Sequence, residues 1–270
     1  MSAVSPLAQP EAWNLVAPEY VRELLPAFET FSRDALIRAG VVQGTRVVDV
    51  ATGPGTLALL AARNGARVTA VDFSPEMIAA LRVRAAEARL GLEVLEGDGM
   101  ALPFDAGAFD AAFSMFGLMF FPDRAQGFGE LHRVLKSGGR AVVSSWTPFD
   151  RSPELGAVYA RLWEQLGAPQ SKDDAPIPLS TAESCLQEMS GAGFASVSVH
   201  EVESHIDYPT TAAMVDATTR SSAPAVLARQ ALGARWEQVL WSMHEHAQSV
   251  LGSGPQRVTL TAYLTVGTRR

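Results

Sequence analysis

Short hydrophobic runs alternate with amphipathic stretches through the first half of the chain. The runs predict strands at residues 45–50, 67–71, 92–96, 109–114 and 140–145. Apolar residues recur every three or four positions between the runs, which predicts helices at 56–64, 75–89 and 124–136. Strands that are apolar on both faces and separated by helices indicate a parallel sheet with helices on both sides.

The chain before the first strand is predicted to form a helical cap. Residues 1–16 are rich in proline and are expected to be loose. Residues 18–39 show helical spacing, and Gly40 is a suitable end for that helix.

Capping residues predict three later helix ends. Ser74 offers a capping hydroxyl before a proline, so a helix is predicted to begin there. Lys136 and the glycines after it predict the end of a helix, because a cation and glycines suit a helix C-terminus. Ser180 and Glu183 predict a capping box for a helix that ends near Gly191.

The pattern changes after Trp146. Residues 147–178 are rich in proline, aspartate and serine around one predicted helix at 154–166. The remaining predictions are a more exposed strand at 195–208, three helices within 210–250 and a closing strand at 258–268. The long insertion before the closing strand is the candidate substrate lid.

Composition narrows the function classes. The 270 residues suit one large α/β domain, and the net charge of −7 offers no basic surface for nucleic acid. Cys185 is the one cysteine, so neither an internal disulfide nor a cysteine metal cluster is expected. The first residues lack a signal-peptide pattern and no apolar stretch is long enough to span a bilayer, so we expect a cytoplasmic protein.

Candidate chemistry centres on residues 45–59, TRVVDVATGPGTLAL. A hydrophobic run ends in Asp49, glycines follow at Gly53 and Gly55, and a predicted helix begins at once. The glycines let a ligand approach backbone N–H groups at the positive end of the helix dipole. Asp72 follows Gly53 by 19 residues, at the end of the next strand, where a carboxylate can accept both hydroxyls of a ribose. This pattern by itself also fits a dinucleotide site.

Two further carboxylates favour a different nucleotide. Asp49 lies before the glycines, where it attracts a ligand with a cationic amino-acid tail more strongly than a pyrophosphate. Asp98 follows the third strand and can accept from the exocyclic amine of adenine. A nicotinamide dehydrogenase is therefore the less favoured enzyme class.

Four motifs within residues 40–147 carry a resemblance to a known family: VVDVATGPGT, VTAVDFSPEMI, LEGDGMALPFDAGAFDAAFSMFGLMFF and ELHRVLKSGGRAVVSSW. The chain resembles class I S-adenosylmethionine-dependent methyltransferases, in particular the small-molecule branch that includes ubiquinone and menaquinone C-methyltransferases. The resemblance implies a doubly wound, Rossmann-like sheet of seven strands, mostly parallel with an antiparallel last strand, plus helical lid insertions. It implies a single domain over residues 1–270, made of a helical cap (1–40), a cofactor-binding core (41–147) and a substrate or lid region (148–270).

The resemblance also implies S-adenosyl-L-methionine as the cofactor, without a metal. The implied cofactor-binding residues are Asp49, Ala51, Thr52, Gly53 and Gly55 around the methionine moiety, Asp72 at the ribose, Phe73 and Met77 at the adenine face, Gly97, Asp98, Gly99 and Met100 at the adenine edge, and Ser114, Met115 and Phe116 near the sulfonium. Ala51 departs from the family, which has glycine there. We expect cofactor binding to survive, provided that the backbone at Ala51 is not left-handed.

The implied reaction is methyl transfer to O, N or C of a small acceptor, with S-adenosyl-L-homocysteine as the product. An aromatic and thioether cluster is expected to line a pocket for an apolar or aromatic acceptor: Phe113, Met115, Phe116, Met119, Phe120 and Phe121. No catalytic base stands out, and the weak candidates are Tyr20, His205, Asp207 and Tyr208. A quinone-biosynthesis C-methyltransferase and a cofactor-binding regulatory or scaffold protein without turnover stay open, as do a monomer and a homodimer.

Overall fold

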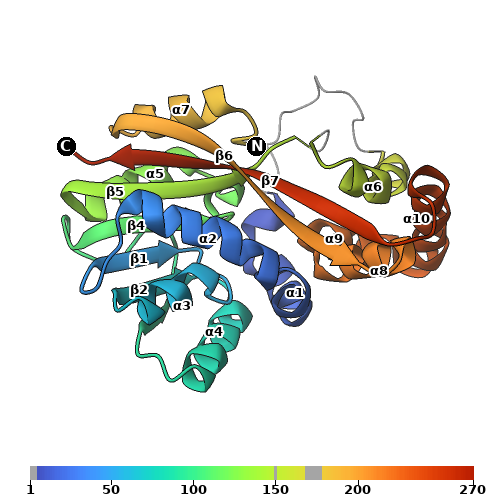
Figure 1. The fold of residues 1–270 in the computed structure, drawn as a ribbon, viewed down its shortest axis with the longest axis horizontal. Helices are drawn as coiled ribbons and strands as arrows, with labels where there is room; N and C mark the ends of the chain where they lie inside the picture. Colours follow the sequence, from blue (N-terminus) through green and yellow to red (C-terminus); the bar gives the residue numbers. More distant parts are fainter. Residues whose placement is uncertain (1–4, 149–150, 168–177) are drawn as a thin grey trace.

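A sheet of seven strands runs through the computed structural model, which describes residues 5–148, 151–167 and 178–270 (Figure 1). The strands are β1 (Arg46–Val50), β2 (Arg67–Asp72), β3 (Glu93–Glu96), β4 (Phe109–Met115), β5 (Leu135–Trp146), β6 (Ala195–Tyr208) and β7 (Gln256–Thr268). Their order across the sheet is β3-β2-β1-β4-β5-β7-β6. β1 to β5 pair in parallel, whereas β7 runs antiparallel to both β5 and β6. The predicted mostly parallel sheet with an antiparallel last strand is confirmed.

Helices cover both faces of this sheet. Successive residues of each strand point to opposite sides, so neighbouring apolar residues are buried under different helices. On β1, Val47 belongs to one buried cluster and Val48 to a second one. The cluster of Val47 includes residues of α2 (Leu25–Ala39), α3 (Thr56–Arg63) and α4 (Pro75–Glu87). The cluster of Val48 includes residues of α5 (Arg124–Val134) and α7 (Ala182–Gly191).

β1 and β4 lie side by side at the point where the chain changes direction across the sheet. From β1 the chain steps outward to β2 and β3, and it then returns to β4 on the other side of β1. The loops that follow β1 and β4 therefore diverge at the carboxyl ends of the strands. Ligands of open parallel sheets bind at such a point.

The second half of the chain builds a helical region at the far end of two long strands. β6 and β7 extend past their neighbours as a ribbon, and four helices gather at its end (Figure 1). They are α6 (Pro153–Leu166), α8 (Thr211–Ser221), α9 (Ala223–Leu232) and α10 (Trp236–Leu251), with the 3₁₀ turn η4 (Gly233–Arg235) before the last. None of the described helices is long and apolar enough to cross a membrane.

Two N-terminal helices replace the predicted loose segment and single helix. α1 (Pro10–Glu23) follows the short turn η1 (Pro6–Ala8), and Leu24 separates it from α2. Residues 10–16 are therefore helical, contrary to the expectation that residues 1–16 are loose, because Ala12 and Val16 give this stretch a buried stripe. α1 lies between the sheet domain and the helical region, since its buried cluster includes Met77 of α4 and Ala223 of α9.

Two other helix ends differ from the prediction. α5 ends at Val134, because Leu135 already pairs with Phe109 of β4 and the lysine after it is held by a carboxylate of that strand. The capping box of α7 is formed by Thr181 and Ser184 rather than by the predicted pair one residue earlier. Ser74 caps α4 as predicted, and its hydroxyl accepts from the N–H of Met77.

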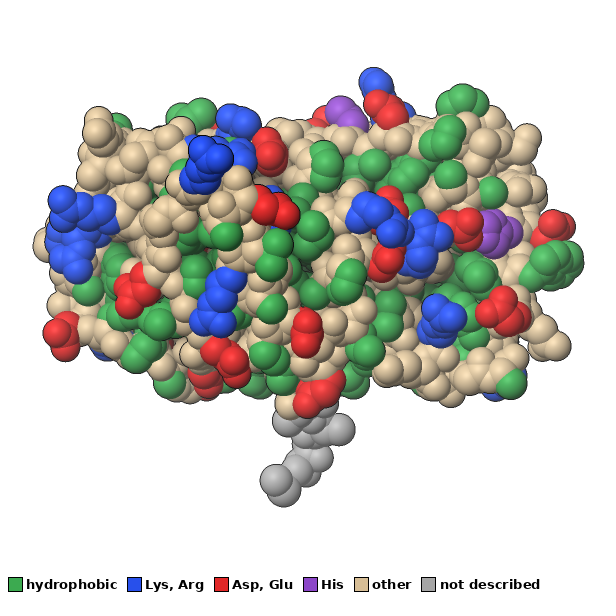
Figure 2. Space-filling model, turned by 90° about the horizontal axis from the view of Figure 1, so that it is seen from below, with side chains coloured by type: hydrophobic (Ala, Val, Ile, Leu, Met, Phe, Trp, Pro, Cys, Tyr) green, Lys and Arg blue, Asp and Glu red, His purple; other side chains and the backbone are tan. Residues whose placement is uncertain are grey.

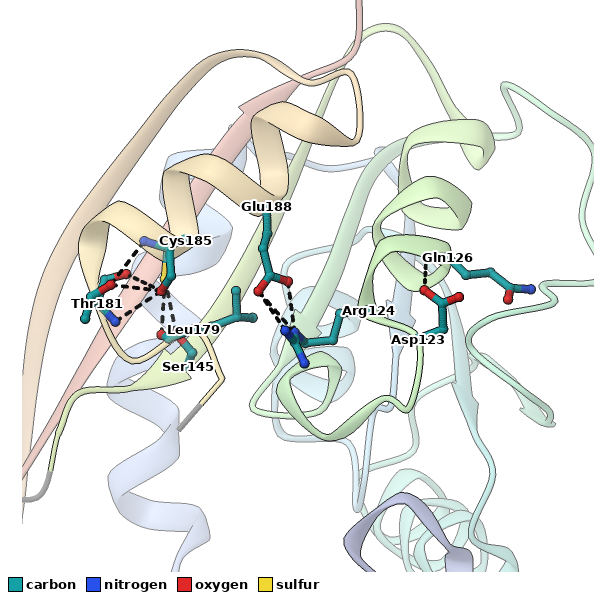
Figure 3. Close-up of polar contacts among 9 residues, drawn as sticks. Asp123, Arg124, Gln126, Ser145, Leu179, Thr181, Cys185 and Glu188 are labelled. Carbon is teal, nitrogen blue, oxygen red and sulfur yellow. Dashed lines mark hydrogen bonds and ion pairs between the residues drawn. The ribbon is translucent and has the colours of Figure 1, made fainter. Parts of the chain in front are cut away.

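Polar contacts fix α7 beside β5 (Figure 3). Arg124 of α5 donates to both carboxylate oxygens of Glu188 on α7, with N–O distances of 2.9 to 3.2 Å. The carbonyl of Leu179 accepts from the Ser145 hydroxyl at 2.7 Å and from the Cys185 thiol at 3.2 Å. These bonds hold the segment before α7 against β5 and make Cys185 a packed core thiol.

Candidate cofactor site

A cavity lies at the carboxyl ends of β1 to β4, where their loops meet the N-terminal helices. Its wall consists of Leu7, Ala8, Trp13, Tyr20, Ala51, Gly53, Asp72, Phe73, Met77, Gly97, Asp98, Gly99, Met100, Met115, Phe116, Gly117, Phe120, Phe121 and Pro122. The charged side chains among these described wall residues are Asp72 and Asp98. Both are acidic, so the wall suits a ligand that carries positive charge.

Asp72 ends β2 and holds the turn after β1. Its Oδ2 accepts from the N–H of Gly53 at 2.7 Å, and its Oδ1 accepts from the N–H of Ser74 at 2.9 Å. Burial raises the pKa of Asp72 to about 6, although these N–H donors oppose the rise. Each carboxylate oxygen keeps a second lone pair, so the side chain can still accept hydrogen bonds from ribose hydroxyls.

Asp49 lies beneath the same turn and is almost fully buried. The Thr52 hydroxyl donates to its Oδ2 at 2.7 Å, while its Oδ1 has no hydrogen-bond partner. Burial raises the pKa of Asp49 to about 7, and the nearby charge of Asp72 adds to the rise. A cationic group in the cavity would offset the cost of ionising this carboxyl. These carboxylate acceptors therefore fit the ammonium of a methionine moiety, and their negative charge disfavours a pyrophosphate at the same turn.

The turn between β1 and α3 depends on left-handed backbone. Gly53 has φ 55° and Gly55 has φ 79°, and a Cβ on Gly55 would lie 2.2 Å from the side chain of Leu81. Ala51 also has φ 55°. The condition on which alanine was expected to be tolerated there, a backbone that is not left-handed, is therefore not met. The next N–H, that of Thr52, donates to the carbonyl of Val71 at 3.0 Å, which fixes the turn in this conformation.

The loop after β3 forms the far end of the cavity. Asp98 is exposed, and its Oδ1 accepts from the N–H of Met100 at 2.8 Å. A Cβ on Gly99 would lie 2.5 Å from the ring of Phe121, so this glycine lets an aromatic ring pack across the loop. Phe73 closes the wall from the loop after β2. Apolar surface with one carboxylate at its edge suits a purine.

Residues at the carboxyl end of β4 form another side of the cavity. The N–H of Phe116 donates to the Ser144 hydroxyl at 2.8 Å, and the Phe116 ring stacks on Trp146 with centroids 4.0 Å apart. Met115 lies beside it in the wall. Ser114 is fully buried behind the wall, where its hydroxyl accepts from the N–H of Leu118 at 3.1 Å. Aromatic and thioether groups at this end suit a cationic sulfonium.

Comparison with known proteins places this chain in a family. A family model described as a methyltransferase domain matches residues 48–143. Demethylmenaquinone methyltransferase of Thermus thermophilus is 44% identical over 154 residues, which cover 53% of this chain and 68% of that protein. The chain belongs to the class I S-adenosylmethionine-dependent methyltransferase family.

Other similarities are shorter or concern the fold alone. Uncharacterized proteins of Mycobacterium tuberculosis and Mycobacterium bovis are 44% identical over 110 residues, or 41% of this chain. The match spans only 40% of the length of those relatives. The crystal structure of the [4+2]-cyclase SpnF has 20% sequence identity and a TM-score of 0.61, and the match covers 96% of this chain and 95% of the cyclase. A cyclase on this fold shows that the fold by itself assigns no reaction.

Most of the residues that the family resemblance assigns to the cofactor come together in the wall. They are Ala51, Gly53, Asp72, Phe73, Met77, Gly97, Asp98, Gly99, Met100, Met115 and Phe116. Asp49, Thr52, Gly55 and Ser114 lie outside the wall, as supports beneath the turn or behind the end of β4. The expected acceptor cluster is split, because Phe113 and Met119 are buried in the core whereas Phe120 and Phe121 reach the cavity beside the loop after β3.

Three of the four candidate bases do not reach the cavity. His205 and Asp207 are exposed on one face of β6, and Asp207 is paired with Arg257 at 2.7 Å. Tyr208 points to the opposite face, as the alternation of a strand requires, and burial raises its pKa to about 12. The structure therefore does not assemble these residues into one site.

Tyr20 does line the cavity. Desolvation raises its pKa far above the usual range, and the charge of Asp72 adds to the rise. The phenol is therefore neutral at physiological pH, so it can donate or accept a hydrogen bond but does not serve as a ready base.

The N-terminal wall was missed by the sequence analysis. Trp13 of α1 donates from Nε1 to the carbonyl of Leu7 at 2.9 Å, and its ring contacts Phe120 with centroids 5.1 Å apart. Leu7, Ala8, Gly117 and Pro122 complete the missed part of the wall. The helical spacing of Ala12 and Val16 is the signal that would have placed Trp13 on an ordered helix.

A basic surface patch or a cluster of metal ligands would be a sign of nucleic-acid or metal binding. Figure 2 shows one face of the molecule, on which Lys and Arg side chains are interspersed with Asp and Glu side chains. This face presents no extended basic patch of the kind that binds nucleic acid. Within residues 5–148, 151–167 and 178–270, no group of three or more His, Cys, Asp or Glu side chains is arranged to hold a metal ion.

Proposed function

We propose that the chain transfers a methyl group from S-adenosyl-L-methionine to O, N or C of a small apolar or aromatic metabolite. The observation that carries the proposal is the pair of buried carboxylates at the ends of adjacent strands, Asp49 with an unpartnered oxygen and Asp72 bound to the N–H of Gly53. A dinucleotide would bring its anionic pyrophosphate to the glycine turn beside this pair, whereas S-adenosyl-L-methionine brings the ammonium of its methionine moiety.

The residues of the wall have separate tasks in this proposal. Asp72 binds the ribose and Asp49 favours the ammonium through its charge. Phe73, Gly99 and Phe121 enclose the adenine, and Met115 and Phe116 exclude water from the sulfonium. When bound, the cofactor supplies an electrophilic methyl group, and its sulfur keeps the electron pair of the broken carbon–sulfur bond. The chain contributes alignment of donor and acceptor and a dry site.

The acceptor is proposed to approach beside Tyr20 and Phe116, since both line the cavity near the aromatic stack on Trp146. Among the described residues of the wall there is no strong base, so an acceptor with a good nucleophile suits the site best. A quinone-biosynthesis C-methyltransferase is the second candidate function, favoured by the identity with the Thermus thermophilus demethylmenaquinone methyltransferase. An electron-rich quinol carbon fits a site of this kind.

An acceptor screen tests the proposal. Purified chain, S-adenosyl-L-methionine and a panel of phenols, amines, heterocycles and reduced quinones are incubated, and release of S-adenosyl-L-homocysteine is measured. We expect release with at least one apolar or aromatic acceptor, and release with a demethylated quinol would select the second candidate. Cofactor binding without release on any acceptor would instead identify a cofactor-binding scaffold and contradict the proposed turnover.

A further inference from the structure

The loops after β1 and β4 touch at one point beside the cavity, between Ala51 and Gly117. A Cβ built on Gly117 would lie 2.3 Å from the Cβ of Ala51, far closer than two methyl groups can approach. The backbone of Gly117 has φ −99° and ψ −53°, which any residue can adopt. Gly117 is therefore required by space rather than by its backbone angles, and the methyl group of Ala51 occupies that space.

Both loops hold a non-glycine residue in left-handed backbone at this contact. Ala51 has φ 55° and Phe116, which precedes Gly117, has φ 59°. Such backbone is unfavourable for residues with a Cβ and persists where the surroundings hold it in place. Phe116 is held from one side by the Ser144 hydroxyl and by the stack on Trp146. On the other side, the next residue of its loop meets Ala51.

We propose that Ala51 is a positioning residue, whose methyl group packs against Gly117 and fixes the loop that presents Phe116 to the cavity. The proposal rests on the proposed function, which assigns the Phe116 end of the cavity to the sulfonium. It accounts for alanine at a left-handed position where the family has glycine. In this chain, the contact with Gly117 offsets part of the backbone cost, and residues 51 and 117 act as one steric unit.

A double-mutant cycle tests the unit, because it moves one methyl group from one loop to the other. The variants are Ala51→Gly, Gly117→Ala and the double variant, with Gly129→Ala on α5 as a matched control whose new Cβ meets nothing within 4 Å. Each full-length variant is titrated with S-adenosyl-L-methionine and with S-adenosyl-L-homocysteine by calorimetry, and its thermal unfolding is followed.

The steric unit predicts a distinct pattern of affinities. Gly117→Ala should weaken S-adenosyl-L-methionine binding at least tenfold and lower the unfolding midpoint, because its new methyl group collides with that of Ala51. Ala51→Gly should raise the unfolding midpoint, since glycine adopts left-handed backbone freely, yet weaken binding at least threefold. The double variant should bind within threefold of the parent, and the control should match the parent in affinity while its unfolding midpoint stays equal or rises, because alanine suits a helix better than glycine. Higher stability with weaker binding is a combination that a purely structural role for Ala51 would not produce.

Two results would overturn the proposal. One is a double variant that binds as weakly as Gly117→Ala or fails to fold, which would place the need for Gly117 elsewhere. The other is an Ala51→Gly variant that binds as tightly as the parent. Both differ from a failure of the proposed function, in which the parent chain itself binds neither S-adenosyl-L-methionine nor S-adenosyl-L-homocysteine.

Discussion

Asp49 and Asp72 in the first half of the chain are buried beside a cavity, whereas His205 and Asp207 in the second half lie exposed on an outer strand. Both pairs were candidates for chemistry on the basis of sequence. The first pair lies at the carboxyl ends of adjacent central strands, where parallel topology brings loops together. The second pair lies along an edge strand, where alternation turns side chains to solvent. Position in the sheet thus separates the two halves more clearly than residue type does.

Removing the Asp72 carboxylate, which is proposed to bind the ribose, should give the largest loss of cofactor affinity. Asp72→Ala deletes acceptors for ribose hydroxyls and releases the N–H of Gly53, and charge-assisted hydrogen bonds contribute about 1.5–3 kcal/mol each. We expect the affinity for S-adenosyl-L-homocysteine to fall about 100-fold or more, measured by calorimetry. Asp105→Ala removes an exposed carboxylate outside the wall and is the control. Equal affinities for the parent and Asp72→Ala would show that Asp72 contributes no more to cofactor binding than the exposed residues of β6.

The next largest effect should be a pH dependence carried by Asp49. Its pKa of about 7 lies within the physiological range, and the ionised form attracts a cationic ligand. We expect the affinity for S-adenosyl-L-methionine to rise roughly tenfold per pH unit as the pH approaches 7 from below, and then to level off. Asp49→Asn should bind weakly at every pH and lack the part of the rise above about pH 6, where the Asp72 carboxyl is already largely ionised. A parent affinity that is flat between about pH 5 and 8 would contradict the role of Asp49.

The same carboxyl should affect the stability of the chain without cofactor. Its folded pKa is raised, so the folded chain binds more protons than the unfolded chain between the normal carboxyl pKa and about 7. The stability contribution of Asp49 is therefore present at low pH and is lost as the pH rises through this window. We expect Asp49→Asn to raise the unfolding midpoint near pH 8 and to change it little near pH 4. The opposite order would mean that the folded pKa of Asp49 is not raised.

A smaller effect is expected at the N-terminal wall. Trp13→Ala removes the ring contact with Phe120 and one side of the cavity, and an aromatic pair contributes about 0.5–1.5 kcal/mol beyond its buried area. The affinity for S-adenosyl-L-homocysteine should fall about three- to tenfold, with partial recovery in Trp13→Phe. Quenching of Trp13 fluorescence on titration offers an independent readout. An unchanged affinity would show that α1 covers the cavity without contributing to binding.

The second half of the chain should give the smallest effect. His205→Ala and Asp207→Ala alter exposed side chains, and the pair of Asp207 with Arg257 is open to solvent. Solvent screens surface pairs of this kind, so stability should change little and cofactor affinity should stay within about twofold of the parent. A large loss of turnover in either variant, with cofactor affinity intact, would return these residues to the acceptor site.

Sequence patterns predicted the sheet well because its evidence is local. The strands from β1 to β4 end within two residues of their expected bounds, since hydrophobic runs and cap residues such as Ser74 mark them directly. The N-terminal cap was predicted poorly because its order comes from distant partners. The spacing of Ala12 and Val16 is compatible with a helix, but it does not reveal that these residues are buried against Met77 of α4 and Ala223 of α9.

The candidate site divides in the same way. The glycines and carboxylates at strand ends could be found from spacing alone, because each follows a recognisable strand. The contact of Ala51 with Gly117 and the packing of Phe121 across Gly99 join residues far apart in sequence, so they required the structure. The same holds for Tyr208, whose burial depends on which face of β6 meets the core.

We propose that the cavity at the ends of β1 to β4 binds S-adenosyl-L-methionine. Calorimetric titration of the full-length chain with S-adenosyl-L-methionine, and separately with NADH, is the decisive experiment. We expect one saturable site for S-adenosyl-L-methionine, competition by S-adenosyl-L-homocysteine and no heat of binding with NADH. Binding of NADH without binding of S-adenosyl-L-methionine would contradict it.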